Sequence, residues 1–232
     1  MRCLTRLIVV AAIIAVLATI ADVAARRLVE DRVAEQIRSS QGLTGEPEVD
    51  VHGWPFVTQL ISGDFQEVQV TSGRAGTAEG LQVDSVDARL REVSLPLGEL
   101  ISGTPAVEVG SVTVTGVVPY STVSRVLAGQ LGSGFSDLDV THRSGDTVTL
   151  SGSYRGLPVE VPVRVRLNGT QVVFAVPEDA AASSPALAAV ARLVSVRVAV
   201  PVLPYGIRVR SLEVTDGGLR LGASATDVRL QG

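Results

Sequence analysis

The sequence contains no lysine, and it has only one cysteine, two histidines and eight aromatic residues among its 232 residues. Cys3, being alone, can form neither an intramolecular disulfide nor a thiolate metal cluster. All twenty basic residues are arginine, so any anion that the protein binds must meet guanidinium groups, whose planar donors suit phosphate oxygens. The net charge of −4 and the isoelectric point near 5.3 argue against nucleic acid as the main partner.

Motifs of common catalytic sites are also missing. No G-x-S-x-G nucleophile turn and no phosphate-binding glycine loop before a helix occur. His52 and His142 are ninety residues apart, and both suit surface or turn positions better than catalysis. Asp137 and Asp139 alternate with apolar residues, but no calcium-loop spacing follows them. We therefore expect no enzymatic activity, no metal and no cofactor.

The N-terminus has the form of an export signal. Arg2 and Arg6 precede fifteen uncharged residues that end before Asp22, as in a signal peptide or a short membrane anchor. We expect residues 1–25 to be an uncleaved anchor in the cytoplasmic membrane and residues 26–232 to be a single exported domain outside the cytoplasm. Small residues at 23–25 leave open a cleaved, secreted alternative.

Helical and linker segments follow this start. Apolar residues at four-residue spacing predict a helix that continues through Val29, Val33 and Ile37. Residues 44–50 have the composition of a linker. Pro55 can open a short helix that Gly63 ends. Further helices are predicted over 121–131, with Ser121 as a possible cap, and over 183–194.

Two-residue periodicity dominates the remainder. The clearest strand spans residues 159–167, where valines face one side while Glu160 and two arginines face the other. In residues 81–97 the apolar alternation slips by one residue after Val83 and again after Leu90, which predicts β-bulges. Asn168-Gly169 and the residues TDGG at 215–218 predict hairpin turns. The fold class is therefore α+β with a long, bulged antiparallel sheet.

The valine-rich strand faces permit two interpretations. They could form an ordinary closed core, or they could form the wall of an apolar container, which short side chains and few aromatics would leave partly empty. Alternation is the same in both cases, so periodicity alone does not separate a dry wall from a dry core.

Residues 53–70, GWPFVTQLISGDFQEVQV, resemble the G-[FW]-P-F-x-T-Q-[LV] signature of the LmeA-like phospholipid-binding family of actinobacterial envelope proteins. The likeness continues through VVPYSTVSRVL, LPVEVPVRVRL and the stretch from LPYGIRVR to the C-terminus. It implies a tubular lipid-binding fold, with a sheet curled around a helix. It also implies non-enzymatic binding or transfer of phospholipid, including phosphatidylinositol types, in support of envelope lipid and lipoglycan assembly.

Two groups of residues are candidates for contact with lipid. The first surrounds the Gly-Trp-Pro turn and is predicted to form a lip at an opening, since aromatic side chains suit the boundary between headgroups and acyl chains. The second is predicted to line the wall. The groups are Trp54, Pro55, Phe56, Leu60, Ile61 and Phe65, and Val161, Val163, Val165 and Phe174.

Each group has a purely structural alternative. The aromatic residues near Pro55 could staple the short helix to the sheet, and the wall residues could be closed core. The rival function is accordingly a membrane-anchored scaffold with a filled core that docks an envelope enzyme, such as a glycosyltransferase.

Overall fold

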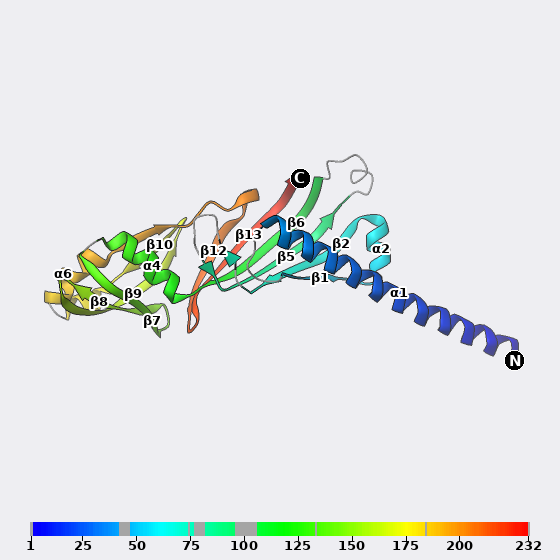
Figure 1. Cartoon of the computed structure of the whole chain (residues 1–232), viewed down its shortest axis with the longest axis horizontal. Coiled ribbons are helices and arrows are strands. Elements are labelled where there is room, and N and C mark those ends of the chain that lie inside the picture. The colour runs from blue at the N-terminus through cyan, green and yellow to red at the C-terminus, as the bar shows by residue number, and fades with distance from the viewer. Residues whose placement is uncertain are drawn as a thin grey trace. The chain divides into compact units, whose positions relative to one another are not determined.

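The computed structural model describes residues 2–41, 47–73, 75–76, 82–95, 106–132, 134–183 and 185–231, and these residues form an α+β fold made mostly of strands (Figure 1). The chain divides into two compact units. The first unit comprises residues 1–72, 88–112 and 226–232, and the second comprises residues 73–87 and 113–225. Three long strands run through both units, which are described separately below.

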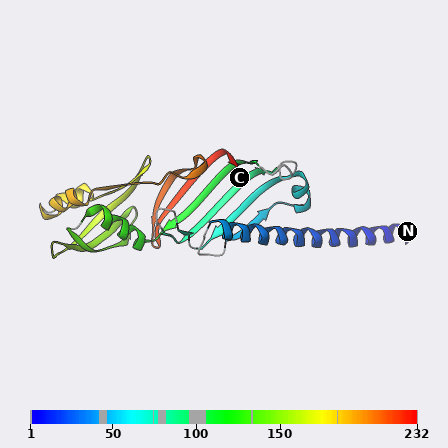
Figure 2. The ribbon, with the colours of Figure 1, turned by 45° about the horizontal axis from the view of Figure 1, so that its top comes forward.

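One sheet has six strands in the order β1-β2-β5-β6-β13-β12 (Figure 2). Its outer pairs are antiparallel, with Val51 of β1 opposite Val68 of β2 and Leu212 of β12 opposite Leu221 of β13. The strands are β1 (Glu48–His52), β2 (Asp64–Ser72), β5 (Ser85–Ser94), β6 (Ala106–Val118), β12 (Arg208–Thr215) and β13 (Gly218–Gln231).

A second, five-stranded antiparallel sheet lies in the second unit, in the order β11-β10-β9-β8-β7. Its strands are joined by tight hairpins, because each pair is connected by two residues that include glycine; β10 and β11 are the exception. The strands are β7 (Phe135–Ser144), β8 (Thr147–Tyr154), β9 (Leu157–Asn168), β10 (Gln171–Ala175) and β11 (Val196–Ala199). A short pair, β3 (Ala75–Gly76) and β4 (Gln82–Val83), is separate.

The helices are α1 (Arg2–Gln41), α2 (Phe56–Ser62), α4 (Tyr120–Leu131), α5 (Glu178–Ala182), α6 (Pro185–Val194) and the single 3₁₀ turn η1 (Pro204–Gly206). Prolines precede α2 and α4 at the N-cap position, where their extended backbone stops the preceding segment. Gly63 ends α2 in the left-handed conformation, as predicted. Ser121 is not the cap of α4, because the helix begins one residue earlier after Pro119.

The predicted bulges coincide with irregularities of the backbone. The step after Val83 falls at the interruption between β4 and β5, and the step after Leu90 contains Glu92, which has a left-handed φ of 54°. Residues 44–50 are only partly a linker, because Glu48–Asp50 already belong to edge strand β1. The Asn168-Gly169 and TDGG hairpins are confirmed.

Two expectations are corrected. Within the described part of the chain, no helix combines the length and the apolar character that crossing a membrane requires, so the single-pass membrane protein expected from residues 1–25 is not supported. The uncharged run of fifteen residues ends at Asp22, whose carboxylate accepts a hydrogen bond from the Val57 amide of the fold. The described strands also form two large open sheets and one short pair, and none of them closes into a tube around a helix.

Gly218 at the start of β13 offers a test of the second unit. Its φ is 145°, and a Cβ atom there would overlap the carbonyl oxygen of Val118 at the end of β6. Gly218→Ala is therefore expected to lower the free energy of unfolding by about 2 kcal/mol or more, measured by urea denaturation. Gly217→Ala is the matched control, because a Cβ at Gly217 meets nothing within 4 Å, and it should change stability by less than about 0.5 kcal/mol.

Candidate lipid-binding groove

The second unit contains an open groove whose lining is entirely apolar. It is formed by the C-terminal end of β6, by α4, by β10, by β11 with the residues after it, and by the start of β13, all of which can be followed in Figure 1. The lining residues are Val118, Val123, Val126, Val172, Phe174, Val198, Ala199, Val200, Pro201, Leu219 and Leu221. No polar side chain interrupts this list, so the groove favours hydrocarbon over any polar ligand.

The sequence produces the groove through alternation on neighbouring strands. Val172 and Phe174 on β10 face the inner side, and Val172 pairs with Val198 of β11. From the other side, Val123 and Val126 project from α4 at three-residue spacing. Six of the eleven lining residues are valine, whose short side chains leave the groove open.

The size of the groove limits its ligand. Its volume is about 100 Å³, less than the roughly 150 Å³ apolar cavity that holds one benzene molecule and below the roughly 300 Å³ of a drug-sized pocket. It therefore accommodates a short length of one acyl chain and does not enclose a two-chain lipid.

The β12–β13 hairpin, which supplies Leu219 and Leu221, is held in place by polar contacts. The Tyr120 hydroxyl at the start of α4 donates to the Thr215 carbonyl oxygen, and Asp216 in the turn lies 2.6 Å from Nδ1 of His142 on β7. Burial, with a smaller contribution from the charge of Asp216, raises the pKa of Tyr120. His142 lies within strand β7, so the turn position predicted for it is wrong, and it makes a contact between the two sheets within the second unit.

The predicted wall residues separate into two kinds. Phe174 is 3% exposed and lines the groove. Val161, Val163 and Val165 are at most 1% exposed and pack inside the closed hydrophobic core. Of the eleven lining residues, sequence reasoning named Phe174 and missed the other ten, although the valine spacing of α4 was visible.

Behind β9, the opposite face of the sheet is charged. Asp146 lies 3.4 Å from both Arg164 and Arg166, and these arginines border a hollow of about 600 Å³. Burial raises the pKa of Asp146, but the hydrogen bond from Arg166 and the charge of Arg164 outweigh it, so the pKa is lowered overall. The arginines point away from the apolar groove, as the alternation predicted.

All six residues of the predicted lip lie in the first unit. Phe56 is fully buried, and its ring centroid lies 6.4 Å from that of Phe65 with the two rings tilted; Phe65 and Leu60 are half-buried. Pro55 is exposed, and Trp54 and Ile61 are 71% and 69% exposed. The turn therefore divides its aromatic residues, with Phe56 as the staple and Trp54 in solvent.

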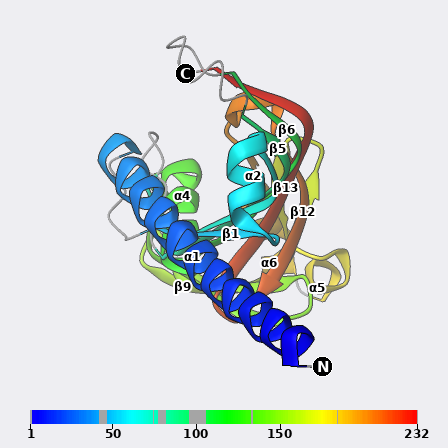
Figure 3. The ribbon, with the colours of Figure 1, turned by 90° about the vertical axis from the view of Figure 1, so that its right-hand side faces the viewer.

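A polar stripe on α1 holds this turn. Asp22 accepts a hydrogen bond of 2.8 Å from the Val57 amide, Arg26 donates to the Gly53 carbonyl, and Glu30 accepts one of 2.8 Å from the Val51 amide on edge strand β1. The three residues recur every four positions, so they share one side of α1, which lies beside α2 and β1 in Figure 3. Asp22 thereby caps α2 in place of the side-chain cap that Pro55 cannot supply.

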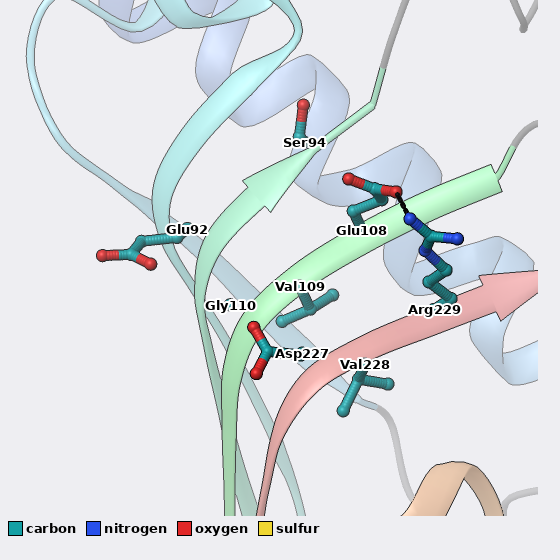
Figure 4. Close-up of a pocket in the computed structure, with 8 residues that line it drawn as sticks. All are labelled: Glu92, Ser94, Glu108, Val109, Gly110, Asp227, Val228 and Arg229. Atoms are coloured by element: carbon teal, nitrogen blue, oxygen red, sulfur yellow. Dashed lines mark ion pairs between the residues drawn. The ribbon is translucent and has the colours of Figure 1, made fainter.

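A polar hollow of about 250 Å³ lies on β5, β6 and β13 in the first unit (Figure 4). Glu108 pairs there with Arg229 at 2.9 Å, whereas Glu92 points away from this pair. Among the residues that the structure describes, no group of three or more His, Cys, Asp or Glu side chains could hold a metal ion. The charged lining distinguishes this hollow from the apolar groove.

The family model of LmeA-like phospholipid-binding proteins matches residues 20–224. The chain belongs to the LmeA-like phospholipid-binding family. The match begins within α1, two residues before Asp22, and includes every residue of the groove. No curated protein and no solved structure was found to match the chain. In this LmeA-like protein, the entirely apolar lining of the groove suits the hydrocarbon part of a phospholipid.

The α2 cap of this LmeA-like protein predicts a specific dependence on pH. The Val57 amide hydrogen bond, aided by the Phe56 amide and Arg26, lowers the pKa of Asp22 against the opposing effect of burial. A carboxylate with a lowered folded-state pKa stabilises the fold above its unfolded pKa of about 3.9, and this contribution is lost as the pH falls through the folded value.

Asp22→Ala removes the acceptor of the Val57 amide and is therefore expected to lower Tm by about 2–4 °C at pH 7. The difference from the unsubstituted protein should shrink below about pH 4, where Asp22 itself becomes protonated. Thermal unfolding followed by circular dichroism across this pH range checks it. Asp31→Ala, on an exposed position of the same helix, should leave Tm unchanged; an equal effect of both substitutions would contradict the capping role.

Proposed function

We propose that this protein binds a phospholipid by holding part of one acyl chain in the groove between α4, β10, β11 and β13. The observation that carries the proposal is the lining of eleven apolar residues without a polar side chain, in a chain that belongs to a phospholipid-binding family. The role is non-enzymatic: the groove presents no nucleophile, acid or base to a bound ester.

The magnitude of burial defines what the groove contributes. At about 0.8 kcal/mol per methylene, about five buried methylenes stabilise a complex by about 4 kcal/mol, which corresponds to millimolar affinity. Removing both chains of a phospholipid from a bilayer costs about 25 kcal/mol for about 32 carbons. At its present volume the groove therefore holds the end of one acyl chain. Lipid transfer in support of envelope lipid assembly would require the groove to widen around a longer part of the acyl chains.

The second candidate function is a scaffold with a filled core that docks an envelope enzyme. The observation that favours it is the closed packing of Val161, Val163 and Val165, which are at most 1% exposed. A scaffold would purify without stoichiometric lipid and would not take up labelled phospholipid from vesicles.

Val126→Phe tests the groove. The larger ring projects from α4 into the groove from a half-buried position, so it should displace the acyl chain and weaken binding of a short-chain fluorescent phospholipid by about tenfold. Fluorescence titration and extraction of bound lipid for mass spectrometry measure the effect.

Ala128→Phe is the matched control, because Ala128 is on the exposed side of the same helix and does not line the groove. Its binding should equal that of the unsubstituted protein. Unchanged binding by Val126→Phe would overturn the assignment of the groove, and absence of lipid binding by the unsubstituted protein would favour the scaffold.

A further inference from the structure

Helix α2 presents an apolar side to solvent. Trp54, Val57 and Ile61 are 71%, 38% and 69% exposed, and their spacing of three and four residues places them on one side of the helix and the turn before it. The opposite side carries the buried Phe56 and Gln59. The exposed tryptophan and isoleucine form an apolar surface whose contact with water is unfavourable.

Helix α4 provides an internal comparison. Like α2, it begins with an aromatic residue directly after a proline and buries one side against its own unit. Its exposed positions nevertheless carry no large apolar side chain: they are Ser121, Arg125, Ala128, Gly129 and Gln130. Exposure of a short helix in this chain therefore does not itself require apolar residues, and the composition of α2 calls for a separate cause.

The absence of charged side chains from the turn and from α2 favours a bilayer as the partner. The stretch from Gly53 to Gly63 contains no charged residue, so none of its side chains would carry a charge into a bilayer interface. Tryptophan favours the boundary between headgroups and acyl chains of a bilayer, where charged side chains are costly.

A cation lies directly beside this uncharged stretch. The Arg26 guanidinium is bonded to the Gly53 carbonyl, lies 5.9 Å from the Phe56 ring, and keeps 27% of its side chain accessible. Apolar side chains with an adjoining guanidinium complement the acyl region and the phosphate of a phospholipid surface.

We propose that Trp54, Val57 and Ile61 form a docking surface that inserts into the interface of a phospholipid bilayer, while Arg26 meets lipid phosphate. The polar stripe on α1 and the Gly63 cap hold α2 in place before it meets the bilayer, so insertion does not need a helix to form. The docking surface lies in the first unit and the groove in the second, and the proposal does not depend on the groove.

The single tryptophan makes the docking surface its own reporter. The full chain is mixed with vesicles of phosphatidylcholine and phosphatidylglycerol, and Trp54 emission is recorded. We expect a shift to shorter wavelength, and quenching by lipids with a nitroxide on the upper part of the acyl chain. Because α1 also exposes apolar side chains, local emission is more informative here than sedimentation with vesicles.

Ile61→Ser should raise the lipid concentration needed for half of the shift by about tenfold, because an exposed isoleucine contributes through burial in the interface. Val202→Ser is the control, since Val202 is 99% exposed in the second unit and should leave the shift unchanged. Both variants should keep the Tm of the unsubstituted protein.

Three outcomes would overturn the docking surface: no shift with vesicles, a shift that Ile61→Ser does not weaken, or a shift that depends on protein concentration without lipid and so reports contact between copies of the chain. Failure of the groove is distinguishable. If Val126→Phe leaves short-chain lipid binding unchanged while vesicles still shift Trp54, only the groove is lost.

Discussion

Short valine side chains on a sheet of fixed strand spacing are the constraint on which the binding site depends. Neighbouring strands lie about 4.8 Å apart whatever their sequence, so the depth of the apolar layer follows from side-chain length. In the middle of the five-stranded sheet, Val161, Val163 and Val165 meet other core residues and leave no space. Towards its β11 edge, Val172 and Val198 meet α4 and β13 less completely, and the groove is what remains.

The two units place a helix on a strand by the same means. In the first unit the Gln59 side chain of α2 is buried and accepts a hydrogen bond from the Gln66 amide of β2. In the second, the buried Ser124 of α4 accepts one from the Val140 amide of β7. Each bond satisfies a strand amide and fixes the helix by a polar contact within an apolar layer. The two helices nevertheless differ on the side that faces solvent: α2 exposes the apolar Val57 and Ile61, whereas α4 exposes no large apolar side chain.

Local patterns predicted local structure well. The apolar alternation predicted β9, the Asn168-Gly169 pair predicted the β9–β10 hairpin, and Pro55 and Gly63 predicted the two ends of α2. Each of these features depends on residues that are close in sequence. Core and groove were not separable, since a packed and an open valine have the same period. The cap on α2 could not be predicted either, because Asp22 reaches Val57 across thirty-five residues and its position after an apolar run is typical of an export signal.

The cap has a practical consequence for work with fragments. A common choice for a recombinant fragment would begin at Arg26, immediately after the apolar stretch. Such a fragment keeps the partners of Gly53 and Val51 but discards the carboxylate that binds the first turn of α2. In such a fragment the Val57 amide in the first turn of α2 would lack its side-chain acceptor, and the turn that carries Trp54 would be held less firmly. A fragment that retains residues from 20 onward, where the family match begins, preserves the native geometry of that loop.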